Sequence, residues 1–459
     1  MSVFSSSLKT AIIDPQFHSE SRCEFRLENR GQAYMPTLRI GNLGLSKTGA
    51  TVNKYQFGAG TASVISRIRL MDGNEELDSL RNVAQWLTFK GALKSNSQNT
   101  NVFNNLSGDS QGWVYGDTGE LVDANTKEVR AGDDSTTGSL DLRECFGFLN
   151  SVSHLSTKLF PNLRVIIEYV PNASTQLLVN SQAGADIANL RKVVPILICD
   201  EITDDALVAT LDKQLTEASW VAVETDLSNM PRAFDPAGAT VNTTATQRVN
   251  LRINGFQDKT VSRLMIAKCY EETGQAGPNV NQGTIGPFEV KALGGYGSKA
   301  LHKEKFNLRL NGRNVLAGDG LVTPSQMTMM LSDTWGALNM CPFQNTENCG
   351  RDVVYSNFEG TPIGPRNTVG INVTVPSARS TAPGAGLPQH GYWVSNSAWI
   401  GVPIQERVSD LQIDLERVAT FSEGTSSSAG NYQSMNLVIF GEVAKGMSVS
   451  GGSYRVFYA

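Results

Sequence analysis

The chain has 459 residues and a mass of 49.6 kDa, which at roughly 150 residues per domain leaves room for two or three domains. Hydrophobic residues make up 40% of it, which excludes a disordered chain. Charged residues make up only 18%, and Asn, Ser, Thr, Gln and 43 Gly take their place, as in β-rich proteins with many turns. The formal net charge of −5 argues against a general nucleic-acid binder, so we expect no sequence-specific nucleic-acid partner.

The charge is unevenly distributed along the chain. Residues 1–70 hold nine Lys and Arg against four acidic residues, a balance of +5, so the remainder carries −10. The favoured interpretation is that these basic residues lie on strands and pair with acidic neighbours. The alternative is a basic face turned toward a polyanion.

The first fourteen residues lack a basic segment followed by a long apolar one, so no secretory signal is expected. The longest apolar run, at residues 193–199, is far shorter than the ~18 residues of a membrane span. None of the cysteines forms a CxxC pair, and without an export signal we expect them to be reduced and structural; a disulfide between the last two stays open. The six are Cys23, Cys145, Cys199, Cys269, Cys341 and Cys349.

Hydrophobic alternation with period two predicts strands along most of the chain. It recurs at residues 23–28, 64–70, 248–254, 305–310, 371–375 and 411–415. Three runs are continuously apolar instead, at residues 165–170, 193–199 and 437–440. Such runs predict strands that are covered on both faces.

Helical patterns are few. Residues 78–93 carry an apolar stripe of Leu80, Val83, Ala84 and Leu87, which predicts a helix. Residues 323–338 begin with a capping signature, and residues 203–214 form a weaker helical stretch.

The first two helices lie in an internal repeat. Residues 67–70 (RIRL) precede an Asp-Gly turn, the first helix and Trp86. Residues 307–310 (NLRL), 240 positions later, precede an Asn-Gly turn, the second helix and Trp335. An offset near half the chain predicts two similar domains in tandem. A second, weaker similarity between the two halves relates Asn162-Leu163 to Asn436-Leu437.

Several segments resemble catalytic motifs but lack the required context. Residues 108–112 match GxSxG inside a polar tract, without the strand and helix of a nucleophile elbow. Residues 41–48 resemble a phosphate loop without a following helix, and residues 295–300 a dinucleotide fingerprint that leads into a strand. The four histidines are scattered, and the acidic pairs 133–134 and 204–205 fit solvated charge or helix starts. We therefore expect no catalytic, cofactor-binding or metal-binding residues, no cofactor and no enzyme activity.

Three long polar tracts, at residues 94–139, 274–297 and 341–390, are predicted as loops. Loops of this length in a compact domain usually have a function or pack against neighbours. Together with the low charge, they suggest protein–protein contact on several faces.

The repeated hairpin–helix blocks at residues 67–93 and 307–338, and the passage through residues 196–220, resemble the double jelly-roll major capsid proteins of double-stranded DNA viruses. That group spans large eukaryotic DNA viruses, virophages and polinton-like viruses. The resemblance implies an all-β fold of two tandem jelly-roll β-sandwich domains with short helices and long loops. The first domain would be residues 1–205 with loop 94–139, and the second residues 206–459 with loops 274–297 and 341–390.

The resemblance further implies a homotrimer that forms a pseudo-hexagonal capsomer and tiles an icosahedral virus shell. Neighbouring capsomers and penton and minor capsid proteins would be its partners, and an internal membrane is left open. The protein would be part of the virion, made inside the host cell and not secreted.

The alternative function is a carbohydrate-binding or adhesive β-sandwich module. It would need an exposed aromatic platform, for which the chain offers five residues in or beside loops: Trp113, Tyr115, Tyr392, Trp393 and Trp399. A β-rich hydrolase ranks third, because no acid–base or metal constellation is visible.

Shortening the first polar tract should change stability little. Acidic residues outnumber basic ones seven to three between residues 94 and 139, and few apolar residues are available to bury the tract. Loop-closure entropy grows only slowly with length. We expect that replacing residues 95–134 with a short Gly/Ser linker leaves the assembly yield and melting temperature near those of the parent chain. A shortened chain that fails to fold would show that the tract belongs to the core.

Overall fold

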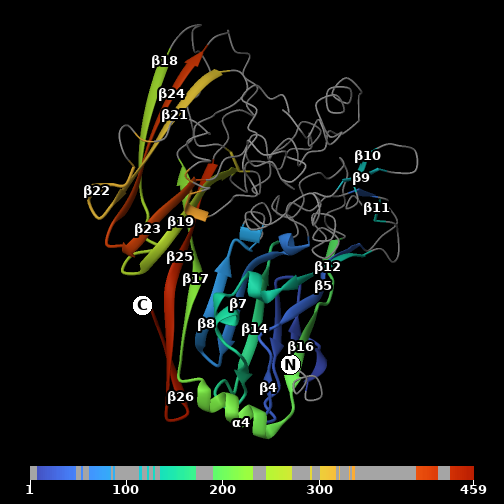
Figure 1. Cartoon of the computed structure of the whole chain (residues 1–459). Coiled ribbons are helices and arrows are strands. Elements are labelled where there is room, and N and C mark those ends of the chain that lie inside the picture. Colours follow the sequence, from blue (N-terminus) through green and yellow to red (C-terminus); the bar gives the residue numbers. More distant parts are fainter. Residues whose placement is uncertain are drawn as a thin grey trace.

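The computed structural model describes residues 8–47, 53–54, 61–83, 86–87, 113–115, 121–123, 128–129, 135–171, 190–230, 244–270, 290–291, 300–316, 320, 330, 333–335, 400–421 and 435–458. Most of them lie in four antiparallel sheets, which pack in pairs as two β-sandwiches (Figure 1). We name each sheet by its central strand.

The first sandwich pairs the β16 sheet with the β14 sheet. The β16 sheet has the order β12-β5-β16-β4-β13, with β1 added to β16 and β15 to β5. Its strands are β1 (Leu8–Ile13), β4 (Ala33–Tyr34), β5 (Arg39–Lys47), β12 (Ser135–Asp141), β13 (Leu155–Ser156), β15 (Leu190–Lys192) and β16 (Ile196–Ile202). The β14 sheet runs β2-β3-β14-β7-β8, with β2 (Phe17–His18), β3 (Arg22–Arg26), β14 (Leu163–Tyr169), β7 (Ile65–Asp72) and β8 (Glu75–Arg81).

The second sandwich pairs the β25 sheet with the β24 sheet. In the β25 sheet, β17 and β19 flank β25, β26 also pairs with β25, and β20 and β23 pair with β19. Its strands are β17 (Glu217–Met230), β19 (Thr260–Tyr270), β20 (Val290–Lys291), β23 (Ile400–Arg407), β25 (Met435–Ser450) and β26 (Ser453–Tyr458). The β24 sheet runs β18-β24-β21-β22, with β18 (Thr244–Arg252), β24 (Leu411–Phe421), β21 (Ala300–Leu310) and β22 (Arg313–Asn314).

The two sandwiches repeat one topology. The order β1-β16-β5-β12 in the first matches β17-β25-β19-β23 in the second, and β3-β14-β7-β8 matches β18-β24-β21-β22. The turns after β7 and β21 are also equivalent: Gly73 has φ 58° and Gly312 has φ 80°, a region that glycine adopts without strain. The predicted tandem repeat is confirmed. The predicted equivalence of residues 162–163 with residues 436–437 is wrong, because β14 and β25 hold different positions in their sandwiches.

The strand patterns in the described residues behave as expected with one exception, and the pattern at residues 371–375 lies outside the described residues. Cys23, Phe25 and Leu27 are at most 1% exposed, and residues 437–440 are all buried, with alternate side chains in two different cores. The apolar run at residues 193–199 was expected to be covered on both faces. Within one chain this is wrong, because Val194 is 53% exposed.

The expected helix over residues 78–93 is wrong at its start. Residues 75–81 form strand β8, and helical backbone is found only at Val83, Trp86 and Leu87 in the described part of that range. Both Leu77 and Asp78 are fully buried, because β8 has one face on the core and the other on the second sandwich. Burial on both faces removes the period-two signal on which strand prediction depends.

The three predicted loops are only partly described. The tract 94–139 contains β9 (Trp113–Tyr115), β10 (Leu121–Asp123), β11 (Glu128–Val129) and the start of β12, so a loop throughout is wrong. β20 lies within 274–297, and 341–390 lies outside the described residues. After β12 the chain turns helical, through Leu142–Glu144 and α3 (Gly147–Ser151).

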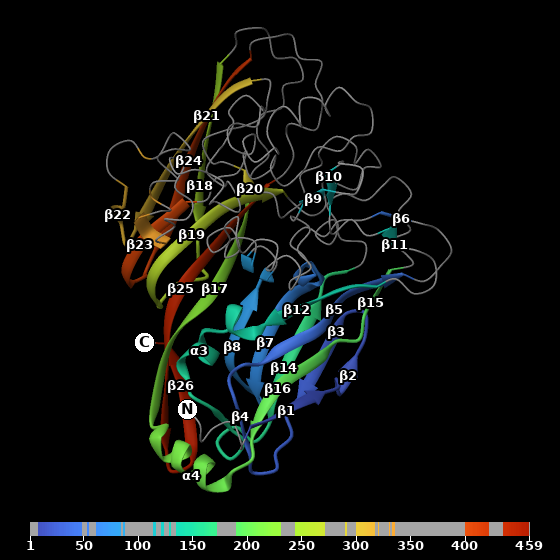
Figure 2. The same ribbon diagram turned by 45° about the vertical axis from the view of Figure 1, so that its right-hand side comes forward.

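The predicted passage between the sandwiches is confirmed: β16 leads through helix α4 (Asp205–Gln214) into β17. The Asp204 carboxylate caps the helix by accepting hydrogen bonds from the backbone N–H groups of Ala206 and Leu207. Val208 packs on Ala33 and Ile202 of the first sandwich. From α4, strands β17, β25 and β26 run alongside β8 and α3 (Figures 1 and 2).

Candidate functional site

The segments that resemble catalytic motifs do not form catalytic structures where they are described. Residues 41–47 form strand β5, whereas a phosphate-binding loop would have to be a loop that leads into a helix. Asp204 and Asp205 lie at the start of helix α4. The GxSxG match and nearly all of residues 295–300 lie outside the described residues. Across the described ranges, no group of three His, Cys, Asp or Glu side chains is arranged to hold a metal ion, and no helix has the length and apolarity of a membrane span.

The sequence singled out two further sets of residues that bear on function. Cys23 and Cys199 are free and buried and Cys145 is buried, while Cys341 and Cys349 lie outside the described residues. Of the proposed aromatic platform, Trp113 and Tyr115 lie in strand β9, and Tyr392, Trp393 and Trp399 are not described.

The excess of basic residues near the N-terminus is largely paired within the sheets. Arg22 and Arg164 both contact Glu24, at 2.7 and 2.9 Å, and Arg69 contacts Glu168 at 2.7 Å. Arg22 and Glu24 both belong to β3, whereas the Arg164–Glu24 and Arg69–Glu168 pairs cross between neighbouring strands on the outer face of the β14 sheet. Five of the six arginines in residues 1–70 thus have an acidic partner, as the favoured interpretation expects, and Arg26 donates a hydrogen bond to Asn162.

A Ser–His–Asp row occurs at residues 153, 154 and 212. The Ser153 hydroxyl lies 3.0 Å from His154 Nδ1, and the Asp212 carboxylate lies 3.0 Å from Nε2. A nucleophile and its base need access to a substrate, but the His154 side chain is 0% exposed. The hydrogen bond between His154 and Asp212 instead connects the segment after α3 to helix α4.

The two sandwiches meet along a buried apolar contact, which we call the seam. Trp220 and Ala222 on β17, and Phe440 and Met447 on β25, belong to the same buried cluster as the core of the first sandwich. Ring contacts that cross the seam include Phe148–Trp220 at 5.1 Å, Trp86–Phe440 at 5.3 Å and Phe160–Tyr454 at 5.0 Å between centroids. The β25 sheet is therefore buried on both faces along its middle.

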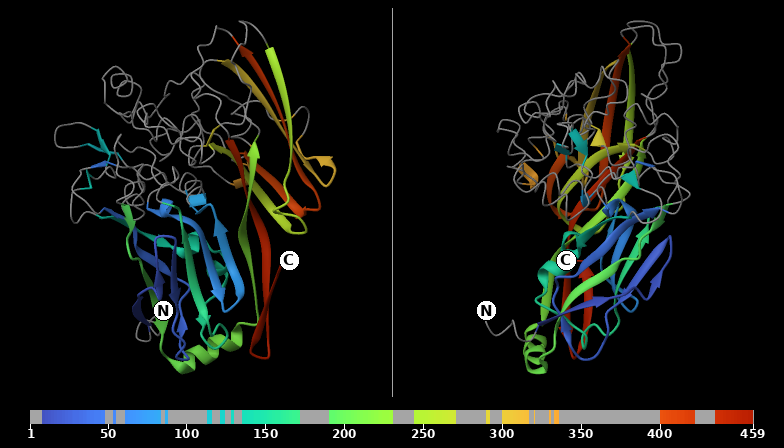
Figure 3. Two further views of the ribbon diagram at one scale, coloured as in Figure 1. Left: turned by 180° about the vertical axis from the view of Figure 1, so that it is seen from behind. Right: turned by 90° about the vertical axis from the view of Figure 1, so that its right-hand side faces the viewer.

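The backbones of the two sandwiches also approach each other closely at the seam. A Cβ at Gly147 in α3 would lie 1.9 Å from the carbonyl oxygen of Val221, so only glycine allows this approach. The last described strand closes the side of the seam: the Tyr454 hydroxyl donates a hydrogen bond to Asp72 Oδ2 at 2.8 Å. Figure 3 shows β25 and β26 lying along the first sandwich from two further directions.

A buried group of charges lies within this apolar seam. Asp78 on β8 is fully buried and accepts hydrogen bonds from the backbone N–H of Phe148 at 3.0 Å and of Ser79 at 2.9 Å. From the second sandwich, Lys445 Nζ lies 3.3 Å from Glu224 Oε1, and the Tyr458 hydroxyl donates to the same oxygen at 3.0 Å. Lys259 approaches the other Glu224 oxygen at 3.7 Å.

The surroundings move the pKa of these groups in different directions. Burial raises the pKa of Asp78 to about 7, against the opposing effects of Lys445 and the two backbone N–H groups. Burial acts in the same direction on Glu224, but Lys445, Lys259 and the Tyr458 hydroxyl outweigh it and lower the pKa of Glu224. Asp78 is thus the member of the seam that titrates near neutral pH.

Sequence analysis did not identify these seam contacts, because they join positions far apart along the chain, from 72 residues for Phe148 and Trp220 to 354 for Trp86 and Phe440. One signal was present: Glu442 and Lys445 interrupt an otherwise apolar and small-residue stretch at residues 437–447. A charged side chain within a buried strand requires a partner, but the sequence does not say which.

Removing the Trp220 side chain should strongly destabilise the chain. Trp220 is 5% exposed and packs against Phe148, so Trp220→Ala leaves a cavity in the seam. We expect a loss of about 3–5 kcal/mol in the free energy of unfolding, measured by chemical denaturation. The adjacent Val221 is 46% exposed, and Val221→Ala is the matched control, with an expected change within ~0.5 kcal/mol. Equal effects of the two substitutions would contradict the seam.

Asp78 should make stability depend on pH between its ordinary pKa of 3.8 and its folded pKa of about 7. In that window the folded state retains the proton that the unfolded state has released. This contribution to stability is therefore full below the lower value and is lost as pH rises through the folded pKa, by up to ~1.4 kcal/mol per pH unit.

Asp78→Asn removes this titration. It also loses one backbone hydrogen bond, a cost that does not vary with pH. Relative to the parent chain, the variant should therefore gain stability between pH 5 and pH 8, as measured by denaturant unfolding. Asp258→Asn, at a side chain 70% exposed, serves as the control and should show no such trend. Parallel pH profiles for Asp78→Asn and the parent would contradict the assignment.

Comparison with known proteins identifies the fold. No protein-family model matches the chain, and no curated protein matches its sequence. Among solved structures, a chain of the PBCV-1 virus capsid aligns over 98% of this chain and 97% of its own length, with a TM-score of 0.52 and 11% identity. A chain of the Sputnik virophage aligns over 98% of this chain and 88% of its own length, with a TM-score of 0.54 and 10% identity.

Both alignments span the two sandwiches and the passage between them. The chain therefore has the double jelly-roll fold found in the capsids of these viruses, and the fold class expected from the sequence is confirmed. At this level of identity the likeness concerns architecture, and function is argued separately.

Proposed function

We propose that the protein is a major capsid protein, a structural subunit of an icosahedral virus shell. The observation that carries this proposal is the alignment of the whole chain, both sandwiches included, with chains of two viral capsids. The buried seam supports it, because a shell subunit must transmit load between its domains without bending, and two-faced burial of the β25 sheet provides that stiffness.

The finer parts of the proposal follow from the same role. The subunit forms a homotrimer of six jelly rolls, and these capsomers contact one another and penton and minor capsid proteins. The domains divide at residues 205 and 206, where α4 begins. The protein works in the virion without enzyme activity, cofactor or metal, and it is made inside the host cell. The adhesive-module alternative has no described observation in its favour.

The test is the native mass and shape of the full-length chain. Multi-angle light scattering should give about three times 49.6 kDa, and negative-stain images should show hexagonal particles or shells. Obligate interfaces make folding and association inseparable, so dilution to micromolar concentration should not release a folded monomer. A stable folded monomer under those conditions would overturn the proposal.

A further inference from the structure

The outer face of the β14 sheet is rich in arginine. Strands β3, β14, β7 and β8 direct alternate apolar side chains into the first core and their charged side chains to the outer face. Six arginines and three glutamates lie there, which gives this face a charge of +3 in a chain whose net charge is −5. The arginines are Arg22, Arg26, Arg67, Arg69, Arg81 and Arg164, and the glutamates are Glu24, Glu76 and Glu168.

Three of these arginines adjoin one serine on strands β7 and β8. Arg67 lies directly opposite Arg81, and Arg69 lies directly opposite Ser79. Side chains that are directly opposite in an antiparallel pair share a face, with Cβ atoms about 4.5–5.5 Å apart. Like charges in that position destabilise a sheet unless a counter-charge lies between them. We call Arg67, Arg69, Ser79 and Arg81 the arginine square.

The carboxylates beside the arginine square do not balance its charge. Arg67 Nη2 lies 3.1 Å from Glu76 Oε2, and the Ser79 hydroxyl donates to the other Glu76 oxygen at 2.6 Å. Arg69 pairs with a glutamate of β14 at 2.7 Å. Arg81 is exposed, and no acidic side chain of the described residues pairs with it. Three guanidinium groups thus share two carboxylates, and the unpaired one lies opposite another arginine.

A second pair of opposed arginines on the same face is resolved within the chain. Arg26 lies directly opposite Arg164 across β3 and β14. Arg26 donates a hydrogen bond to the Asn162 side chain at 3.0 Å, and Arg164 lies 2.9 Å from Glu24. Each member of that pair therefore has its own acceptor.

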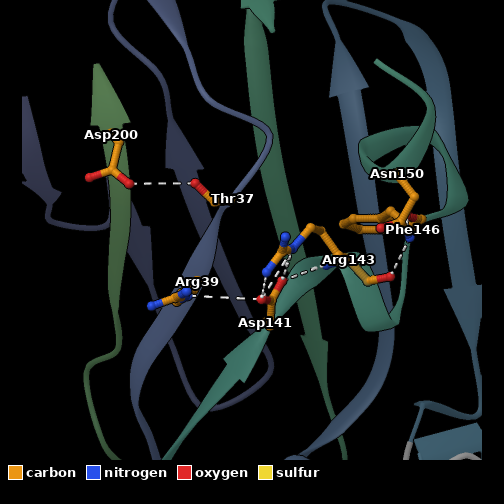
Figure 4. Close-up of polar contacts among 7 residues, drawn as sticks. All are labelled: Thr37, Arg39, Asp141, Arg143, Phe146, Asn150 and Asp200. Carbon is orange, nitrogen blue, oxygen red and sulfur yellow. Dashed lines mark hydrogen bonds and ion pairs between the residues drawn. The ribbon is translucent and has the colours of Figure 1, made fainter. Parts of the chain in front are cut away.

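The β16 sheet also provides an acceptor where two arginines come close. Arg39 lies 3.8 Å from Asp141, which also pairs with Arg143 at 2.6 Å (Figure 4). In both places a group of the chain itself meets each arginine, and Arg81 lacks such a group among the described residues.

The arginine square is held in place before any ligand arrives. The side chains of Arg67 and Arg69 are only 22% and 23% exposed, and their Nε atoms are buried without a hydrogen-bond acceptor among the described residues. Burial lowers the pKa of Arg67; the attraction of Glu76 opposes this shift, and repulsion from Arg81 and Arg69 adds to it. Side chains that are already ordered lose little conformational entropy when they bind a ligand.

The chemistry of the square selects an oxyanion. A guanidinium group presents a planar fork of N–H donors that matches carboxylate and phosphate oxygens, which the ammonium group of lysine does not. A phosphate group brings a charge of about −1.5 to −2 near neutral pH and three free oxygens, whereas a carboxylate brings one charge and two oxygens. The surplus of +3 on this face, with two guanidinium groups and a hydroxyl close together, therefore favours phosphate.

We propose that the arginine square binds a phosphate group, with the guanidinium groups of Arg67 and Arg81 on its oxygens and the Ser79 hydroxyl as a further donor. The phosphate group is that of a small soluble anion or of a lipid headgroup, which offer the same chemistry to the square. This binding site is independent of the proposed capsid function, and its test does not depend on assembly.

The first test is calorimetric titration of the full chain with inorganic phosphate, and with acetate at the same ionic strength. The parent should bind phosphate more tightly than acetate. Arg81→Gln should bind phosphate roughly tenfold more weakly or worse, because it loses a charge-assisted hydrogen bond. Arg248→Gln is the matched control: Arg248 is an exposed arginine of the β24 sheet that pairs with Glu416 at 2.9 Å, and its loss should leave phosphate binding unchanged. Melting temperatures check that each variant folds.

The second test separates the two sources of the phosphate group. Vesicles of phosphatidylcholine, with and without phosphatidic acid, are sedimented with the parent and with Arg81→Gln. Cosedimentation that needs both phosphatidic acid and Arg81 identifies a lipid headgroup, and calorimetric binding of phosphate without cosedimentation identifies a soluble anion. The proposal is overturned if the parent binds neither probe, if acetate binds as tightly as phosphate, or if Arg81→Gln binds like the parent or like Arg248→Gln.

Discussion

The structure depends on the burial of one sheet on both of its faces. Along β25, Leu437 and Ile439 point into the core of the second sandwich, while Val438 and Phe440 point into the seam against the first. An antiparallel sheet usually leaves one face in water, so this arrangement forces the two sandwiches together. Their relative position is then set by packing and not by the length of α4, which only has to bridge the gap.

Charged groups inside this seam add direction to an otherwise non-directional apolar contact. Asp78 reaches the backbone of α3, and Lys445 and Glu224 face it from the second sandwich. Buried charges of this kind cost solvation free energy and contribute little net stability, but they penalise any alternative register of the two domains, since a shifted register would leave a charge without a partner. We interpret the charge group as fixing the register of a contact whose stability comes from the aromatic residues.

The likeness to viral capsid chains at 10–11% identity shows how few residues the fold requires. What recurs between the two sandwiches of this chain is the alternation of apolar residues along equivalent strands and a glycine in the turn after β7 and after β21. Between those points side chains vary freely, because a sandwich core accepts many combinations of aliphatic residues of similar total volume.

The sequence by itself determined three features: the strands with one solvent-exposed face, the tandem repeat, and the connection between the two sandwiches through α4. In each case the signal is local: alternation in Cys23, Phe25 and Leu27, a turn at Gly73 and Gly312, a cap at Asp204. It predicted the absence of a catalytic centre, and that expectation remains a prediction.

Only the tertiary structure decided where the two sandwiches meet. The second half of strand β8, from Asp78 onward, was expected to be helical, because contact on both faces of the strand replaces alternation with a pattern that resembles a helical stripe. The charges of Asp78 and Lys445 influence each other across 367 positions of sequence, and nothing within either segment specifies this proximity. Such contacts arise from the summed packing of many residues, whereas a sequence pattern reports only the neighbours within a few positions along the chain.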